Sequence, residues 1–214
     1  MKKLSLTLMA ILLSAVLVAC GESDIERGEV SQNVTSEKTA NENTVDEKSV
    51  EEEKEEEVKV GTRTNPIKPN EPVIISTIVS DYEKDLRADA EFEIVVSNFI
   101  RGQEAYDILL AENQFNEPAP EGYEWLLFDV SLTANIEDDN LSYYIMPSFN
   151  PFTLDGSPIT VDDFAVTPNE FGHTDVYNGG TVTGKVSTLA PVGEDVLIEY
   201  SSFDFNFFFT TKED

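Results

Sequence analysis

The stretch EWLLFDVSLTANI, residues 124–136, alternates apolar and polar side chains along most of its length. A period of two places successive side chains on opposite faces, which is the pattern of a β-strand with one buried face. We therefore predict a strand here. Its polar face begins with Asp129, and its buried face carries Leu126, Phe128, Val130, Leu132 and Ala134.

Two other stretches show the same period. Residues 89–99 place Phe92, Ile94 and Val96 on one face, and residues 202–210 place a phenylalanine at every second position from 203 to 209. Turn residues separate these stretches from further apolar segments at short intervals, which is typical of an antiparallel sandwich of seven or eight strands. The further segments predicted as strands are 73–80, 143–154, 159–166, 179–189 and 194–200.

One segment between two predicted strands departs from this pattern. Residues 103–113 are rich in helix formers, and Ala105, Ile108 and Leu109 have helical spacing. We predict one short inserted helix that covers an end or edge of the sandwich. Arg101 precedes this helix, and we expect it to pair with Glu104 or Glu112 in a structural role. The alternative is that Arg101 contacts a ligand or partner.

The N-terminus has the layout of a secretory signal peptide over residues 1–19. Two lysines precede an apolar stretch, residues 4–19, which is short for a membrane span. The stretch ends in LVAC, residues 17–20, which resembles the lipobox of bacterial lipoprotein signal peptides. There the cysteine thiol receives a diacylglyceryl group, so we predict lipidation at Cys20. The alternative is an ordinary signal peptide with an incidental cysteine.

Residues 20–59 follow as a polar, acidic segment. Residues 21–59 hold 14 acidic and five basic residues and no aromatic one. Such a composition buries too little apolar surface to offset the entropy of ordering. We predict a disordered tether that spans roughly 35 Å, with an acidic interaction tail as the alternative.

Residues 60–214 form the predicted folded domain. Arg101-Gly102 with Glu104-Ala105, the run from Pro120 to Tyr123, and the glycine-rich stretch 176–200 are similar to the immunoglobulin-like domain of unknown function 4352 family. Members of that family occur in lipoproteins and secreted proteins, mainly of Gram-positive bacteria. The resemblance implies an immunoglobulin-like sandwich, and it carries no catalytic residues over to this chain.

Enzymatic chemistry has little support in the sequence. His173 is the only histidine, Cys20 is the only cysteine, and the motifs of serine hydrolases, zinc proteases and P-loop enzymes are absent. We predict a noncatalytic protein without a cofactor. A cell-envelope hydrolase is the weakest alternative, because carboxylate pairs are inevitable in so acidic a domain.

Calcium binding is a sharper alternative. Clustered carboxylates suit this cation, although EF-hand spacing is absent and a solvated acidic surface explains the same pattern. The weak calcium candidates are Asp138, Asp139, Asp162 and Asp163.

The domain carries 28 acidic and seven basic residues, which argues against nucleic acid and anionic polymers as partners. Phe208 breaks the alternation of its strand, so it is either covered by the inserted helix or a loop, or it contacts a partner.

Taken together, the N-terminal motif and the family resemblance predict a lipid-anchored membrane protein on the extracytoplasmic face of a Gram-positive cell. Its partner would be an envelope or surface protein, with Arg101 and Phe208 as contact candidates. The alternative is a calcium- or small-ligand-binding extracellular module.

Overall fold

The computed structural model describes residues 23–28, 59–161 and 164–213. Within them the protein is mainly β, with antiparallel sheets and a single short helix, as predicted. The elements are β1 (Asp24–Arg27), β2 (Val73–Asp81), β3 (Leu86–Arg101), α1 (Gly102–Glu112), β4 (Tyr123–Ile136), β5 (Ser142–Ile145), β6 (Ser148–Thr153), β7 (Thr174–Tyr177), β8 (Thr181–Pro191), β9 (Val196–Ser201) and β10 (Asn206–Thr210).

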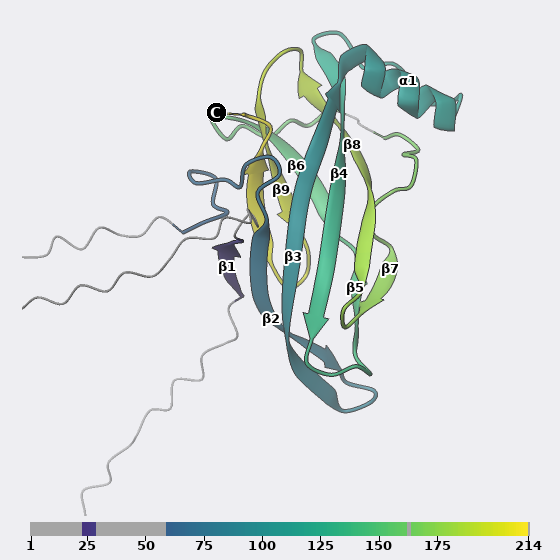
Figure 1. Cartoon of the computed structure of the whole chain (residues 1–214). Coiled ribbons are helices and arrows are strands. Elements are labelled where there is room, and N and C mark those ends of the chain that lie inside the picture. The colour runs from purple at the N-terminus through teal and green to yellow at the C-terminus, as the bar shows by residue number, and fades with distance from the viewer. Residues whose placement is uncertain (1–22, 29–58, 162–163, 214) are drawn as a thin grey trace, which may run out of the picture.

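The strands form a sandwich. A five-stranded sheet has the order β1-β2-β3-β4-β8, and a three-stranded sheet has the order β10-β9-β6 (Figure 1). The strands β5 and β7 pair separately. The main core joins the sheets, since the ring of Phe128 on β4 lies 5.5 Å from that of Phe209 on β10 and 5.7 Å from that of Phe149 on β6.

The predicted faces of β4 are confirmed. Leu126, Phe128, Val130, Leu132 and Ala134 are all buried in the main core. Asp129 lies on the opposite face, where it forms an ion pair with Lys185 and accepts a hydrogen bond from Asn98 Nδ2 at 2.8 Å. Alternation fails only near the start of β4, where both faces are covered.

Helix α1 is the cause of that failure. It lies at one end of the five-stranded sheet, and the β2–β3 hairpin lies at the other (Figure 1). Gly102 has a φ of 66°, in the left-handed region that favours glycine, and lets β3 turn directly into the helix. The helix packs on the outer face of β4, where it forms a second, smaller core of Ala105, Leu109, Trp125, Leu127 and Leu189.

Strand β1 corrects the predicted tether. Residues 24–27 pair antiparallel with β2, with Asp24 opposite Ser76 and Arg27 opposite Val73. Arg27 forms an ion pair with Glu71 and donates hydrogen bonds to Asn65 Oδ1 at 3.0 Å and to the Pro66 carbonyl at 3.1 Å.

The prediction of disorder is therefore wrong for residues 23–28. Composition missed this strand because the residues of β2 with which it pairs lie about 50 positions further along the chain. The predicted signal peptide, Cys20 and residues 29–58 lie outside the described residues.

Three strand predictions are also wrong in detail. The predicted strand 143–154 is divided between β5 and β6, which lie in different sheets. Phe205, Phe207 and Phe209 are buried as expected, but Phe203 is exposed because it lies in the turn before β10. In that turn the Ser202 amide donates to the Phe205 carbonyl at 3.0 Å. The described part of 159–166 contains no strand.

Candidate functional site

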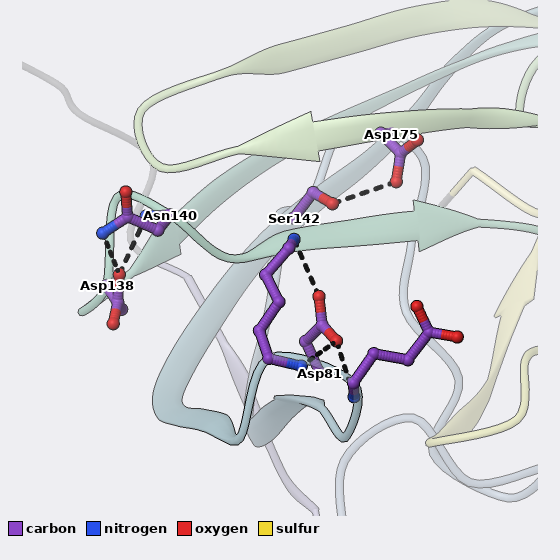
Figure 2. Close-up of polar contacts among 7 residues, drawn as sticks. Asp81, Asp138, Asn140, Ser142 and Asp175 are labelled. Carbon is purple, nitrogen blue, oxygen red and sulfur yellow. Dashed lines mark hydrogen bonds and ion pairs between the residues drawn. The ribbon is translucent and has the colours of Figure 1, made fainter.

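Two of the four carboxylates predicted as calcium candidates, Asp138 and Asp139, accept hydrogen bonds from neighbouring amides. Asp138 Oδ1 accepts hydrogen bonds from the backbone N–H and the side-chain Nδ2 of Asn140, at 2.8 and 3.0 Å (Figure 2). Asp139 Oδ1 accepts one from Asn178 Nδ2 at 2.7 Å. Asp162 and Asp163 lie outside the described residues. Within the described ranges, three or more acidic, histidine or cysteine side chains never gather in a way that could hold a metal ion.

The nearby β2–β3 hairpin shows the same local bonding. Asp81 accepts hydrogen bonds from the backbone N–H groups of Glu83 and Lys84, and its Oδ2 lies 2.8 Å from Lys84 Nζ (Figure 2). The Lys84 side chain is the main reason that the pKa of Asp81 lies below its ordinary value. Ser142 Oγ donates to Asp175 Oδ1 at 3.1 Å in the adjacent β5–β7 pair. These contacts stabilise the loops and leave no converging set of carboxylates.

Arg101 is bonded within the domain. Its Nη2 lies 2.9 Å from Glu124 Oε1 and donates to the carbonyls of Pro191 at 3.2 Å and Glu194 at 2.7 Å. The expected pairing with Glu104 or Glu112 is wrong, because Arg101 still belongs to β3 and lies opposite Leu126, close to Glu124 on β4. The arrangement favours a structural role that ties the β3–α1 junction to the β8–β9 turn.

Phe208 is half-buried and covered by the domain itself. Its ring packs against that of Phe152 on β6 at 5.7 Å. The outer edge of β10 is bonded by residues 61–67, with Phe208 N–H donating to the Gly61 carbonyl at 2.7 Å and Ile67 N–H to the Phe208 carbonyl at 2.9 Å. The cover is thus a loop and a strand, and not the inserted helix. The ring still lines a hollow of about 480 Å³ beside Ile25 of β1.

His173 lies in an exposed loop between β6 and β7. Its backbone has a φ of 54°, and its N–H donates to the Ile145 carbonyl at 2.7 Å. The residue therefore contributes to the loop through its backbone.

The most exposed aromatic residues near the helix were missed from the sequence. Phe115 and Phe164 have 79% and 82% of their surface exposed. They flank a hollow of about 560 Å³ at the C-terminal end of α1, and the buried ring of Trp125 forms part of its wall. We call it the helix-end hollow. Its lining residues are Asn113, Phe115, Asn116, Glu117, Pro118, Pro120, Trp125, Val161 and Phe164.

Hydrogen bonds fix the loop that carries Phe115. The buried Asn116 donates from Nδ2 to the carbonyls of Leu109 at 2.7 Å and Val166 at 2.9 Å, and its Oδ1 accepts the Val166 N–H at 2.8 Å. Trp125 Nε1 donates to the Glu117 carbonyl at 3.0 Å. Phe115 is therefore exposed on a loop that side-chain hydrogen bonds hold in place.

The local sequence held a weak signal for only one of these two residues. Phe115 is a lone aromatic among polar neighbours in NQFNEP, residues 113–118. Phe164 was masked by the apparent alternation of 159–166, which suggested a strand. An isolated aromatic in a polar loop is the feature that would have identified Phe115.

Comparison with protein-family models finds no match for this chain. Comparisons with curated proteins and with solved structures find none either. The resemblance to the immunoglobulin-like family thus remains a prediction. Among the residues that the structure describes, no helix is long and apolar enough to cross a membrane.

Proposed function

We propose that this protein is a lipid-anchored membrane protein of the extracytoplasmic face, whose noncatalytic β-sandwich binds an envelope or surface protein. The observation that carries the proposal is Cys20, which follows two lysines, an apolar stretch of signal-peptide length and small residues. Diacylation there would give a stable anchor, since a single acyl chain holds a protein only weakly.

Strand β1 determines how such an anchor holds the domain. Asp24 follows Cys20 by four residues, which extend over at most about 14 Å. The anchored sandwich would therefore lie close to the bilayer and not at the end of a long tether. Described residues on either side of the acidic segment 29–58 lie at this edge: the Gly28 N–H donates to the Pro72 carbonyl, and Gly61 lies beside Ile25.

The helix-end hollow is the surface that we propose for the partner. Aromatic side chains dominate the energetics of protein interfaces, and ordering them before binding lowers the entropic cost of association. Phe115 is ordered in this way by the Asn116 hydrogen bonds. The strong negative charge of the domain favours a partner with a basic surface.

Lipidation is tested by Triton X-114 partitioning of the mature protein. The wild-type chain should enter the detergent phase, and its N-terminal peptide should carry the mass of a diacylated cysteine. Cys20→Ala should remain in the aqueous phase or accumulate as precursor. Equal partitioning of mature wild-type and variant chains would refute the anchor.

The binding surface is tested by a photo-crosslinking amino acid in intact cells. At position 115 it should give a discrete crosslinked species. At position 154, where the native leucine is also exposed but lies in the turn after β6, it should not. Crosslinking from neither position, or equally from both, would contradict the assignment of the hollow.

A further inference from the structure

A second hollow lies at the edge of the sandwich where the chain enters the domain. Its volume is about 350 Å³, and we call it the anchor-side hollow. Its two aromatic residues are exposed: Phe203 has 88% and Tyr82 has 94% of its surface accessible to solvent. Its lining residues are Ser23, Thr77, Ile78, Ser80, Tyr82, Arg87, Phe203 and Asp204.

The N-terminal chain passes directly beside these rings. Ser23 Oγ donates to the Asp204 carbonyl at 3.0 Å and to Thr77 Oγ1 at 3.3 Å, so the residue before β1 is fixed to the hollow. Ser23 follows Cys20 by three residues, which extend over at most about 11 Å. A lipid on Cys20 would hold this hollow at the bilayer surface.

We propose that Phe203 and Tyr82 dock onto the lipid bilayer beside the anchor, an inference that rests on the proposed lipidation of Cys20. Phe203 has no polar group and can enter the acyl region, whereas tyrosine favours the headgroup level. Arg87 in the same hollow is placed to meet a lipid phosphate. The anchor and the two rings together fix which edge of the sandwich faces the membrane.

Charge limits the kind of bilayer that suits this edge. Asp81, Glu83 and Asp85 surround Tyr82 on the hairpin, and Lys84 is paired with Asp81. Strongly anionic lipid would repel these carboxylates. Docking therefore depends on apolar insertion and is strongest on zwitterionic lipid.

The helix-end hollow belongs to the opposite end of the five-stranded sheet, where α1 lies (Figure 1).

Tryptophan fluorescence tests the proposal in the full, processed chain. The lipidated protein is placed in phosphatidylcholine vesicles whose acyl chains carry bromine, which quenches indole on contact. Phe203→Trp is the probe, and Phe115→Trp is the matched control because both native rings are exposed. Trp125 is buried, and its signal is subtracted by measuring the wild-type chain. The added emission of Phe203→Trp should shift to shorter wavelength and be quenched, while that of Phe115→Trp should not.

Each outcome decides the question. An unquenched Phe203→Trp in a chain that carries the lipid overturns the docking and leaves the anchor intact. Quenching of both variants overturns the proposed orientation. A spectral shift that follows protein concentration and not lipid identifies a second copy as the occupant and also overturns it. A Cys20 without lipid, shown by mass spectrometry, refutes the proposed function and this inference together. Tyr82→Trp provides an independent probe on the other side of the hollow.

Discussion

The phenylalanines between the sheets differ from those on the loops in what holds them. Phe128, Phe207 and Phe209 are almost completely buried, and their neighbours are other aromatic rings and aliphatic chains. Phe115 and Phe203 are largely exposed, and the hydrogen bonds of adjacent Asn116 and Ser202 set the loop shape. Burial stabilises the first group, whereas the second lies in solvent on loops that neighbouring residues have already ordered.

Buried phenylalanines therefore contribute to stability, whereas exposed phenylalanines are available for binding. Removing a buried ring loses transfer energy and opens a cavity. Removing an exposed ring changes little in the folded protein, and its effect should instead appear in contacts with a partner or a bilayer. The predictions below test this division from the largest effect to the smallest.

Phe128→Ala should give the largest loss of stability. The ring is fully buried and lies within 5.7 Å of three other aromatic rings, Phe99, Phe149 and Phe209. We expect the free energy of unfolding to fall by about 3–5 kcal/mol, measured by urea titration with circular dichroism. A loss below about 1 kcal/mol, the size usual for a surface position, would show that the buried face of β4 is misassigned.

Asn116→Ala should have the next largest effect. It removes an amide that satisfies two carbonyls and one N–H group while being buried. Unpaired buried groups cost roughly 1–3 kcal/mol, so a loss of that size is expected in the same titration. The exposed Asn140 is the control, and its replacement by alanine should change stability less. Equal losses would show that the Asn116 bonds do not order the Phe115 loop.

Removal of β1 should expose more of the Phe208 side chain, so that it comes to resemble the exposed phenylalanines of the loops. A chain that begins at Val60 lacks Ile25, which lines the hollow beside Phe208. It also loses the Arg27 ion pair with Glu71. We expect it to fold, with unfolding free energy lower by about 1–2 kcal/mol relative to a chain that begins at Gly21. Equal stability of the two chains would show that β1 does not contribute to the sheet.

Alkaline pH should weaken the interior through its buried tyrosines. Burial raises the pKa of Tyr143 from its ordinary value of 10 to about 12 and also raises the pKa of Tyr200. Above pH 10 the unfolded chain releases these protons while the folded chain retains them, so stability present below pH 10 is lost as pH rises. Tyr143→Phe should reduce the loss between pH 10 and 11 by about 1 kcal/mol. The exposed Tyr144 is the control, and an identical pH profile for Tyr143→Phe and Tyr144→Phe would contradict the assignment.

Phe115→Ala should have the smallest effect on folding. We expect a change within about 0.5 kcal/mol, because the ring makes few contacts that folding creates. With the photo-crosslinking amino acid placed at Glu117 instead, an exposed lining position of the helix-end hollow, Phe115→Ala should lose the crosslinked species. A large destabilisation would show that Phe115 supports the loop instead of projecting from it.

Much of the sandwich was predictable because its signals are local. The alternation along β4 identified its buried face, and helical spacing identified α1 to within a residue at each end. The candidate binding surfaces were harder to predict from the sequence. Arg101 was paired with its helical neighbours, although the sheet register places Glu124 beside it. Phe203 continued the alternation in sequence, but the turn before β10 moved it into solvent.

The sequence by itself determined the β class, the inserted helix, the acidic charge and the motif around Cys20, because each depends on residue type and short spacing. Only the tertiary structure decided that β1 joins the sheet, which edge covers Phe208 and which aromatic residues remain exposed. The physical reason is that strand pairing and edge coverage join segments far apart in the chain. Residues 24–27 pair with residues 73–76 of β2, about 50 positions further along the chain.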